Sequence, residues 1–159
     1  MRFEHLVEIN DLNNPLAFNL SRTQLWAGLM ARVEDSRPFL PGMDECLILE
    51  REAALVRRLL RFGGVEIRDT VTFVEEEWVC FTTEPSAQHA GGTLTIRIET
   101  PRLDLPEQLF LRFTYATSLA ESGDPEDRAY AKYIEAAYHA SDMDTVQEIR
   151  RLAESERAH

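Results

Sequence analysis

A glycine pair between two alternating apolar segments, in the stretch RRLLRFGGVEIRDTV, constrains the fold of this chain most strongly. Gly63-Gly64 supplies the positive φ angles that a two-residue hairpin turn requires. The register of that hairpin places Arg58 directly opposite Asp69, on the face that is otherwise apolar. A shift of one residue would exchange the two faces of both strands, and the register is therefore strongly specified.

A charged pair on a core face has two interpretations. A buried aspartate must be paired or protonated, and arginine offers bidentate geometry, so Arg58 and Asp69 can form a purely structural ion pair. The same pair can also line a pocket, where it would orient a carbonyl or hydroxyl group of a ligand. The sequence leaves both interpretations open, and both can hold together.

The rest of the chain predicts an antiparallel sheet with two helices. The segment RFEHLVEIN alternates as a half-buried strand, and SRTQLWAGLMARVE follows as a helix in which Ser21 and Gln24 form a capping box. Short turns join the next strands, which is typical of a meander and not of βαβ units. These six strands are predicted at Asp44–Arg51, Ala54–Phe62, Val65–Val74, Trp78–Thr83, Thr93–Thr100 and Gln108–Thr117.

A long helix is predicted at the end of the chain, with Asp124 as its N-cap and Pro125 as its first residue. The segment HASDMD at 139–144 indicates a break or kink, after which Ser141 or Asp142 would cap a second helical segment. No other predicted element is long enough to cover the apolar face of a curved sheet. The expected fold class is therefore α+β, arranged as a single domain over residues 1–159.

Composition restricts the classes of partner. A formal net charge of −11 argues against nucleic acids and anionic membrane surfaces, which need a basic face. No apolar run is long enough to span a bilayer, and no signal peptide is evident, so we expect a cytoplasmic protein without membrane insertion. Cys46 and Cys80 stand alone, and no histidine spacing suits a metal, so we expect neither a metal nor another cofactor.

Five stretches of the chain have sequences that are characteristic of a known protein family: FEHLVEIN, LSRTQLWAGLMARVEDSRPFLPGM, RRLLRFGGVEIRDTVTF, LFLRFTYATSL and AYHASDMDTVQEIRRL. Together they resemble the AtaL-like family of the SRPBCC superfamily, the START and polyketide cyclase-like proteins. The resemblance implies a helix-grip fold, in which a curved seven-stranded antiparallel sheet wraps around the long C-terminal helix and a short helix follows the first strand. It also implies an apolar cavity between sheet and helix, where relatives bind lipids, sterols or polyketides and some catalyse cyclisation or dehydration.

The expected function is binding of a mainly apolar small molecule, of lipid-, polyketide- or aromatic-like chemistry. Arg58, Asp69 and Tyr115 are the candidate polar anchors of the cavity, because they share the inner face of their strands. The candidate apolar lining comes from the inner sheet face, the short helix and the long helix: Trp26, Leu60, Ile67, Val71, Phe73, Ile96, Leu111, Phe113, Tyr130 and Ile134.

Two other functions remain open. The first is a cyclase- or lyase-like enzyme with Asp69 as general base and with Arg58 or Tyr115 polarising a carbonyl. The second is a non-catalytic interaction module that uses the outer face, which carries Leu59 and Phe110, or pairs through an edge strand. A homodimer is compatible with the sequence. His5, alone on an apolar face, is expected to be a hydrogen-bonded core histidine and not a base.

Overall fold

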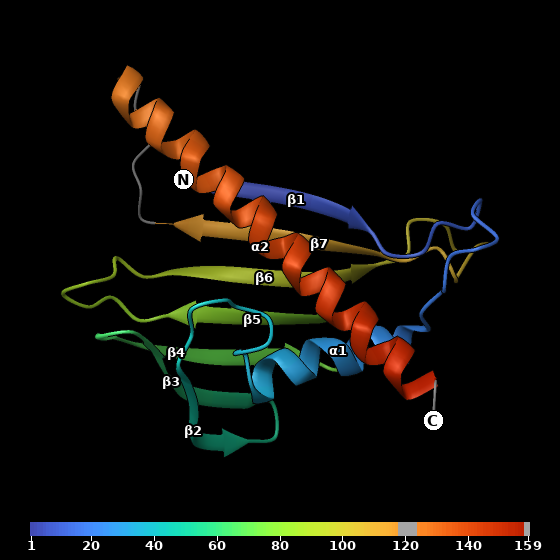
Figure 1. Ribbon diagram of the computed structural model, residues 1–159, viewed down its shortest axis with the longest axis horizontal. Helices are drawn as coiled ribbons and strands as arrows, with labels where there is room; N and C mark the ends of the chain where they lie inside the picture. The colour runs from blue at the N-terminus through green and yellow to red at the C-terminus, as the bar shows by residue number, and fades with distance from the viewer. Residues whose placement is uncertain (118–123, 158–159) are drawn as a thin grey trace.

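The computed structural model describes residues 1–117 and 124–157, in which an antiparallel sheet curves around a long helix (Figure 1). Seven strands form one sheet in the order β1-β7-β6-β5-β4-β3-β2, which confirms the predicted α+β arrangement. The elements are β1 (Arg2–Glu8), α1 (Arg22–Glu34), β2 (Glu45–Glu52), β3 (Leu55–Phe62), β4 (Val65–Val74), β5 (Trp78–Thr83), β6 (Gly92–Glu99), β7 (Phe110–Thr117) and α2 (Pro125–Arg157).

The β3–β4 hairpin has the register that its alternation predicts. Arg58 pairs with Asp69, and both side chains are almost fully buried, with 2% and 4% of their surface exposed. Gly63 adopts a φ of 60°, a left-handed conformation that favours glycine at this turn. The apolar alternation and the glycine turn therefore agree, which is why the pairing could be read from the chain.

Helix α1 begins with the predicted capping box between Ser21 and Gln24. It packs closely against α2 at Gly28. A Cβ atom at position 28 would lie 2.6 Å from the Cγ2 atom of Ile149, so only glycine permits this approach. The two helices thereby share one core with the sheet.

Helix α2 is continuous, so the predicted break at 139–144 is wrong. Asp142 does not act as a cap; its side chain is fully buried and finds partners on the sheet. A local pattern of serine and aspartate resembles a helix start, but these residues are compatible with a helix interior when tertiary contacts satisfy them. The pattern alone could not show those contacts.

The two halves of α2 differ in burial. Eight of its first nine residues, Pro125 to Tyr133, are exposed, and the exception is the partly covered Ala131. Figure 1 shows this part rising away from the sheet. Its second half is packed into the core through Val146 and Ile149. In the described part of the chain, neither helix contains an apolar stretch of the length needed to cross a membrane.

Candidate functional site

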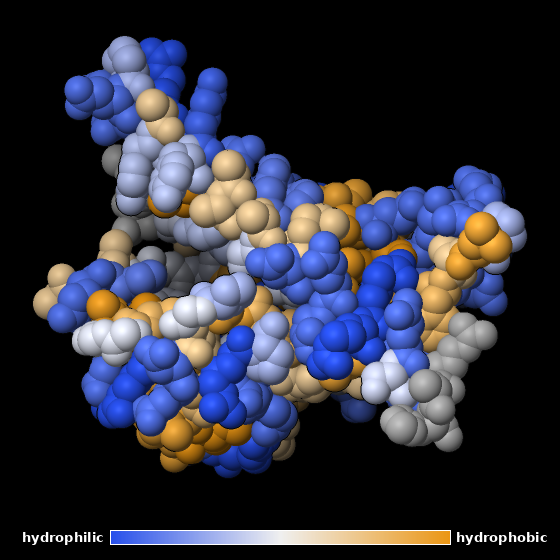
Figure 2. All heavy atoms as spheres, in the orientation of Figure 1, coloured by the Kyte–Doolittle hydropathy of each residue, from blue (hydrophilic) through white to orange (hydrophobic). Residues whose placement is uncertain are grey.

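A cavity of about 320 Å³ lies at the end of the sheet that carries the β3–β4 turn and the β5–β6 connection. Figure 2 shows the molecule hollowed on this side, below the first half of α2. The volume is within the range of small-molecule sites in proteins. The lining combines apolar side chains with polar ones: Leu40, Leu60, Phe62, Ile67, Phe81 and Leu94 with Arg32, Arg58, Asp69, Thr83, His89, Tyr115, Tyr138 and Ser141.

Five of the candidate site residues come together at this cavity. Arg58, Asp69 and Tyr115 lie in its polar part, and Leu60 and Ile67 lie in its apolar part. All five are on the inner face near the strand ends that surround the cavity. Their role as ligand contacts stays a prediction.

Most of the other candidate residues lie in filled core instead of the cavity wall. Alternation identified the inner face correctly, but these side chains belong to the core cluster or pack against it, where α1 and the second half of α2 meet the sheet. Trp26 packs near Phe73, for example, with ring centroids 6.1 Å apart. The residues that the structure places in or against the core in this way are Trp26, Val71, Phe73, Ile96, Leu111 and Phe113.

The two α2 candidates also lie outside the cavity wall. Tyr130 is 53% exposed, because the first half of α2 stands away from the sheet. Ile134 is partly buried and packs against the core cluster. From this helix the cavity receives Tyr138 and Ser141, which lie one to three turns further along.

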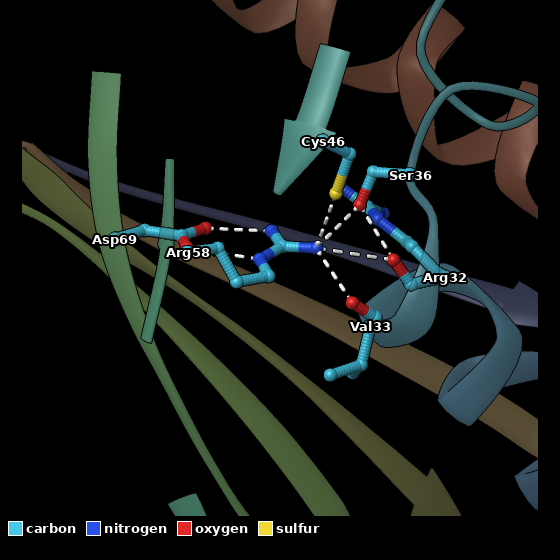
Figure 3. Close-up of polar contacts among 6 residues, drawn as sticks. All are labelled: Arg32, Val33, Ser36, Cys46, Arg58 and Asp69. Atoms are coloured by element: carbon cyan, nitrogen blue, oxygen red, sulfur yellow. Dashed lines mark hydrogen bonds and ion pairs between the residues drawn. The ribbon is translucent and has the colours of Figure 1, made fainter. Parts of the chain in front are cut away.

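Arg58 and Asp69 form a bidentate ion pair (Figure 3). The Nε atom of Arg58 donates to Oδ1 of Asp69 at 2.9 Å, and one terminal nitrogen donates to Oδ2 at 2.6 Å. Both carboxylate oxygens are therefore engaged. Removal of either partner would leave the other as an uncompensated buried charge.

The second terminal nitrogen of Arg58 connects the sheet to the end of α1. It donates to the Ser36 hydroxyl at 2.7 Å and to the carbonyl oxygens of Val33 and Arg32 at 3.0 and 3.2 Å (Figure 3). A positive group at the last carbonyls of a helix is favourable, because those carbonyls have no partner within the helix. A guanidinium has five N–H donors, and these contacts leave little capacity for a ligand. The geometry therefore supports the structural interpretation of the pair.

A second buried carboxylate, Asp142 on α2, is held by two strands. The Tyr115 hydroxyl of β7 donates to its Oδ1 atom, and His5 Nδ1 of β1 lies 3.0 Å from its Oδ2 atom. His5 is partly exposed and stacks on His139, with ring centroids 4.1 Å apart. Tyr115 also stacks on Tyr138 at 3.8 Å. As expected, His5 is a hydrogen-bonded inward-facing histidine.

Burial shifts the titration of this group. It raises the pKa of the Asp142 carboxyl above its usual value, and the hydrogen bonds from Tyr115 and His5 oppose that rise. Burial, and next the nearby Asp142 charge, also raise the pKa of Tyr115, which keeps the phenol protonated. Tyr115 thus presents a neutral hydroxyl at the cavity and connects it to a buried carboxyl group whose pKa is raised.

Arg32 and Asp142 are two buried charged residues of this region that were not among the candidates predicted from the sequence. Arg32 is 5% exposed and lines the cavity. A signal was present, because Leu25, Leu29 and Arg32 follow the i, i+4, i+7 spacing of one helix face. Asp142 had no comparable local signal, because its partners lie more than 25 residues away in the chain.

Metal ligands do not cluster in the described part of the chain: no group of three histidine, cysteine, aspartate or glutamate side chains could hold an ion there. Cys46 and Cys80 are free thiols of intermediate exposure.

The curved sheet, the short helix after β1 and the long C-terminal helix define a helix-grip protein of the SRPBCC type. Residues 7–156 match the model of one family, described as AtaL, acetylaranotin biosynthesis cluster protein L. The chain belongs to this family. No curated protein matches the chain significantly.

Solved structures share the fold at low sequence identity. The di-domain aromatase/cyclase StfQ from the steffimycin biosynthetic pathway has a TM-score of 0.69 and 13% identity, over 99% of this chain and 52% of that one. The Zhui aromatase/cyclase from Streptomyces sp. R1128 has a TM-score of 0.61 and 15% identity, over 95% and 94%. The Aha1 dimer from Colwellia psychrerythraea has a TM-score of 0.60 and 12% identity, over 94% and 96%.

Proposed function

We propose that this protein binds a mainly apolar small molecule, of lipid-, polyketide- or aromatic-like chemistry, in the cavity between the strand ends and α2. The composition of the cavity wall carries this proposal. Leu60, Ile67, Phe81 and Leu94 supply apolar surface, and a few buried polar groups lie among them. Such a wall holds a ligand by apolar burial and orients it by hydrogen bonds. Two proteins with this fold, StfQ and Zhui, are aromatase/cyclases, and this supports a polyketide-like ligand.

Native mass spectrometry of freshly purified protein tests the proposal by detecting a co-purified small molecule. The neutral probe 2-naphthamide, titrated by calorimetry, tests binding when no such molecule is retained. Leu94→Trp fills the cavity and should abolish both signals. Leu47→Trp, at a 43% exposed leucine of the edge strand β2, is the matched control and should preserve them. Equal signals from the two variants, or no binding by the wild type, would contradict the proposal.

A second candidate function is acid–base catalysis in the same cavity. The chain of Tyr115, Asp142 and His5 favours it, because it connects a hydroxyl in the cavity wall with a partly exposed histidine. Asp69 is less suited to be the base, since Arg58 engages both of its oxygens. Tyr115→Phe should abolish conversion of a co-purified ligand and preserve its binding; conversion at an unchanged rate would exclude Tyr115.

The interaction-module alternative has weaker support. It would be favoured by a completely filled core, whereas a cavity is present, and Leu59 on the outer face is only 7% exposed. Exposed leucines do occur on the edge strand β2, at Leu47 and Leu49. Homodimer formation and a cytoplasmic location stay predictions.

A further inference from the structure

Arg32 is a buried cation in the cavity wall that has no acidic partner. It lies in the last turn of α1 with 5% of its surface exposed. Its guanidinium carbon is 4.9 Å from the centre of the Phe81 ring, and Phe81 lines the same cavity. A cation–π contact of this kind is attractive but supplies no negative counter-charge.

The hydrogen bonds of Arg32 are incomplete. One terminal nitrogen donates to the Thr145 hydroxyl at 2.9 Å. Among residues 1–117 and 124–157, the Nε atom is the one buried side-chain nitrogen or oxygen that has no hydrogen-bond partner. No carboxylate in those ranges forms an ion pair with Arg32, whereas Arg58 binds both oxygens of Asp69. Buried donors in proteins are normally satisfied, so the unpaired Nε leaves the Arg32 guanidinium short of acceptors.

The electrostatics of the cavity agree with the lack of an acidic partner for Arg32. Burial lowers the pKa of Arg32, and the positive Arg58 adds to the effect. Tyr115, Asp142 and Asp69 act in the opposite direction without offsetting the effect of burial. A guanidinium still keeps its proton under these conditions, so the cavity contains an uncompensated positive charge.

We propose that the ligand of this cavity carries an anionic oxygen, a carboxylate or a phenolate, which accepts a hydrogen bond from Arg32 and compensates its charge. The proposal rests on the proposed small-molecule function and specifies the ligand class. An apolar body would pack against Leu60, Ile67 and Leu94, and the anionic group would lie at the Arg32 side of the wall. Water is the competing acceptor for the Arg32 guanidinium, and it would supply no charge preference.

The test compares two probes of nearly equal shape, anionic 2-naphthoate and neutral 2-naphthamide, by calorimetric titration at pH 7. A hydrogen bond to a charged group predicts that the wild type binds naphthoate about tenfold or more tightly than naphthamide. Arg32→Gln should bind both probes with similar affinity. Arg68→Gln is the matched control, because Arg68 is exposed on the opposite face of β4, and it should retain the preference.

A second measurement uses the wild type alone, so it does not require that the Arg32→Gln variant folds. In ¹⁵N spectra of the wild type, the Arg32 Nε–H resonance should move downfield with naphthoate and stay in place with naphthamide. Equal affinity of the wild type for the two probes, or an unmoved resonance at saturating naphthoate, would overturn the anion proposal alone and leave the proposed function standing. Binding of neither probe would overturn both.

Discussion

The two buried carboxylates of this protein, Asp69 on β4 and Asp142 on α2, are held by different kinds of partner. Asp69 lies opposite an arginine on the neighbouring strand and accepts two hydrogen bonds from it. Asp142 receives a tyrosine hydroxyl and a histidine from two strands that are distant in sequence. A full positive charge compensates the first carboxylate, and mainly hydrogen bonds support the second.

The difference indicates that Asp69 has a structural role, whereas Asp142 belongs to the polar part of the candidate site. The Arg58–Asp69 pair joins β3, β4 and the end of α1, so its charges are fixed parts of the fold. Asp142 has a raised pKa because burial opposes its charge, and it contacts the Tyr115 hydroxyl at the cavity. Burial thus favours the protonated form of Asp142, and the hydrogen bonds from its two partners oppose that preference.

The largest effect is expected at the ion pair. Asp69→Asn removes the negative charge and leaves Arg58 buried without compensation, so it should lower the free energy of unfolding by about 3–5 kcal/mol. Urea denaturation followed by circular dichroism measures this loss. Asp104→Asn is the control, because its pair with Arg102 is exposed and should contribute little. Similar losses for the two variants would contradict the structural role of Asp69.

A smaller effect is expected from the hydroxyl that supports Asp142. Tyr115→Phe keeps the ring and its stacking on Tyr138 but removes one donor from the buried carboxyl, which should cost about 1 kcal/mol in unfolding free energy. The pKa of Asp142 should also rise further, as measured by carboxyl ¹³C chemical shifts. Tyr133→Phe, at a tyrosine 70% exposed on α2, should change neither quantity. An unchanged Asp142 titration in Tyr115→Phe would show that the hydroxyl does not stabilise the charge.

The smallest effect at neutral pH, and the clearest pH signature, is expected from Asp142→Asn. The pKa of Asp142 is higher in the folded than in the unfolded chain, so between the two values the folded state binds more protons. The stability that protonated Asp142 contributes is complete below about pH 3.9, which is the pKa of an aspartate in the unfolded chain. This contribution is lost as the pH rises through the pKa of Asp142 in the folded chain. The variant should therefore show a flatter decline of unfolding free energy with pH than the wild type in that window. Parallel pH profiles for the two proteins would contradict this assignment.

The fold could be predicted because its signals are local. Alternation over β3 and β4, with a glycine at a turn that needs positive φ, was enough to pair Arg58 with Asp69. The capping box at Ser21 likewise marked the start of α1. Each of these signals lies within a few residues of the feature that it predicts.

The site was less predictable, because it depends on where α2 crosses the sheet. Alternation shows that Leu60 and Phe113 both face inward, but only the path of the helix leaves Leu60 at a cavity and Phe113 in filled core. The same path brings Asp142 to Tyr115, and this contact satisfies the aspartate inside a continuous helix, although its local sequence resembles a helix cap. Arg32 could have been found from its helical spacing, since an arginine on an apolar face is itself a signal.

Gly28 has a consequence for protein engineering at a distance from the cavity. A methyl group at this position would press on Ile149 and displace α2 from α1. Because α2 is continuous, its axis carries such a displacement two turns along to Ser141 and on to Tyr138, which line the cavity. Substitutions at position 28 therefore offer a way to tune the width of the binding site, and so its ligand selectivity, without altering any residue of its wall.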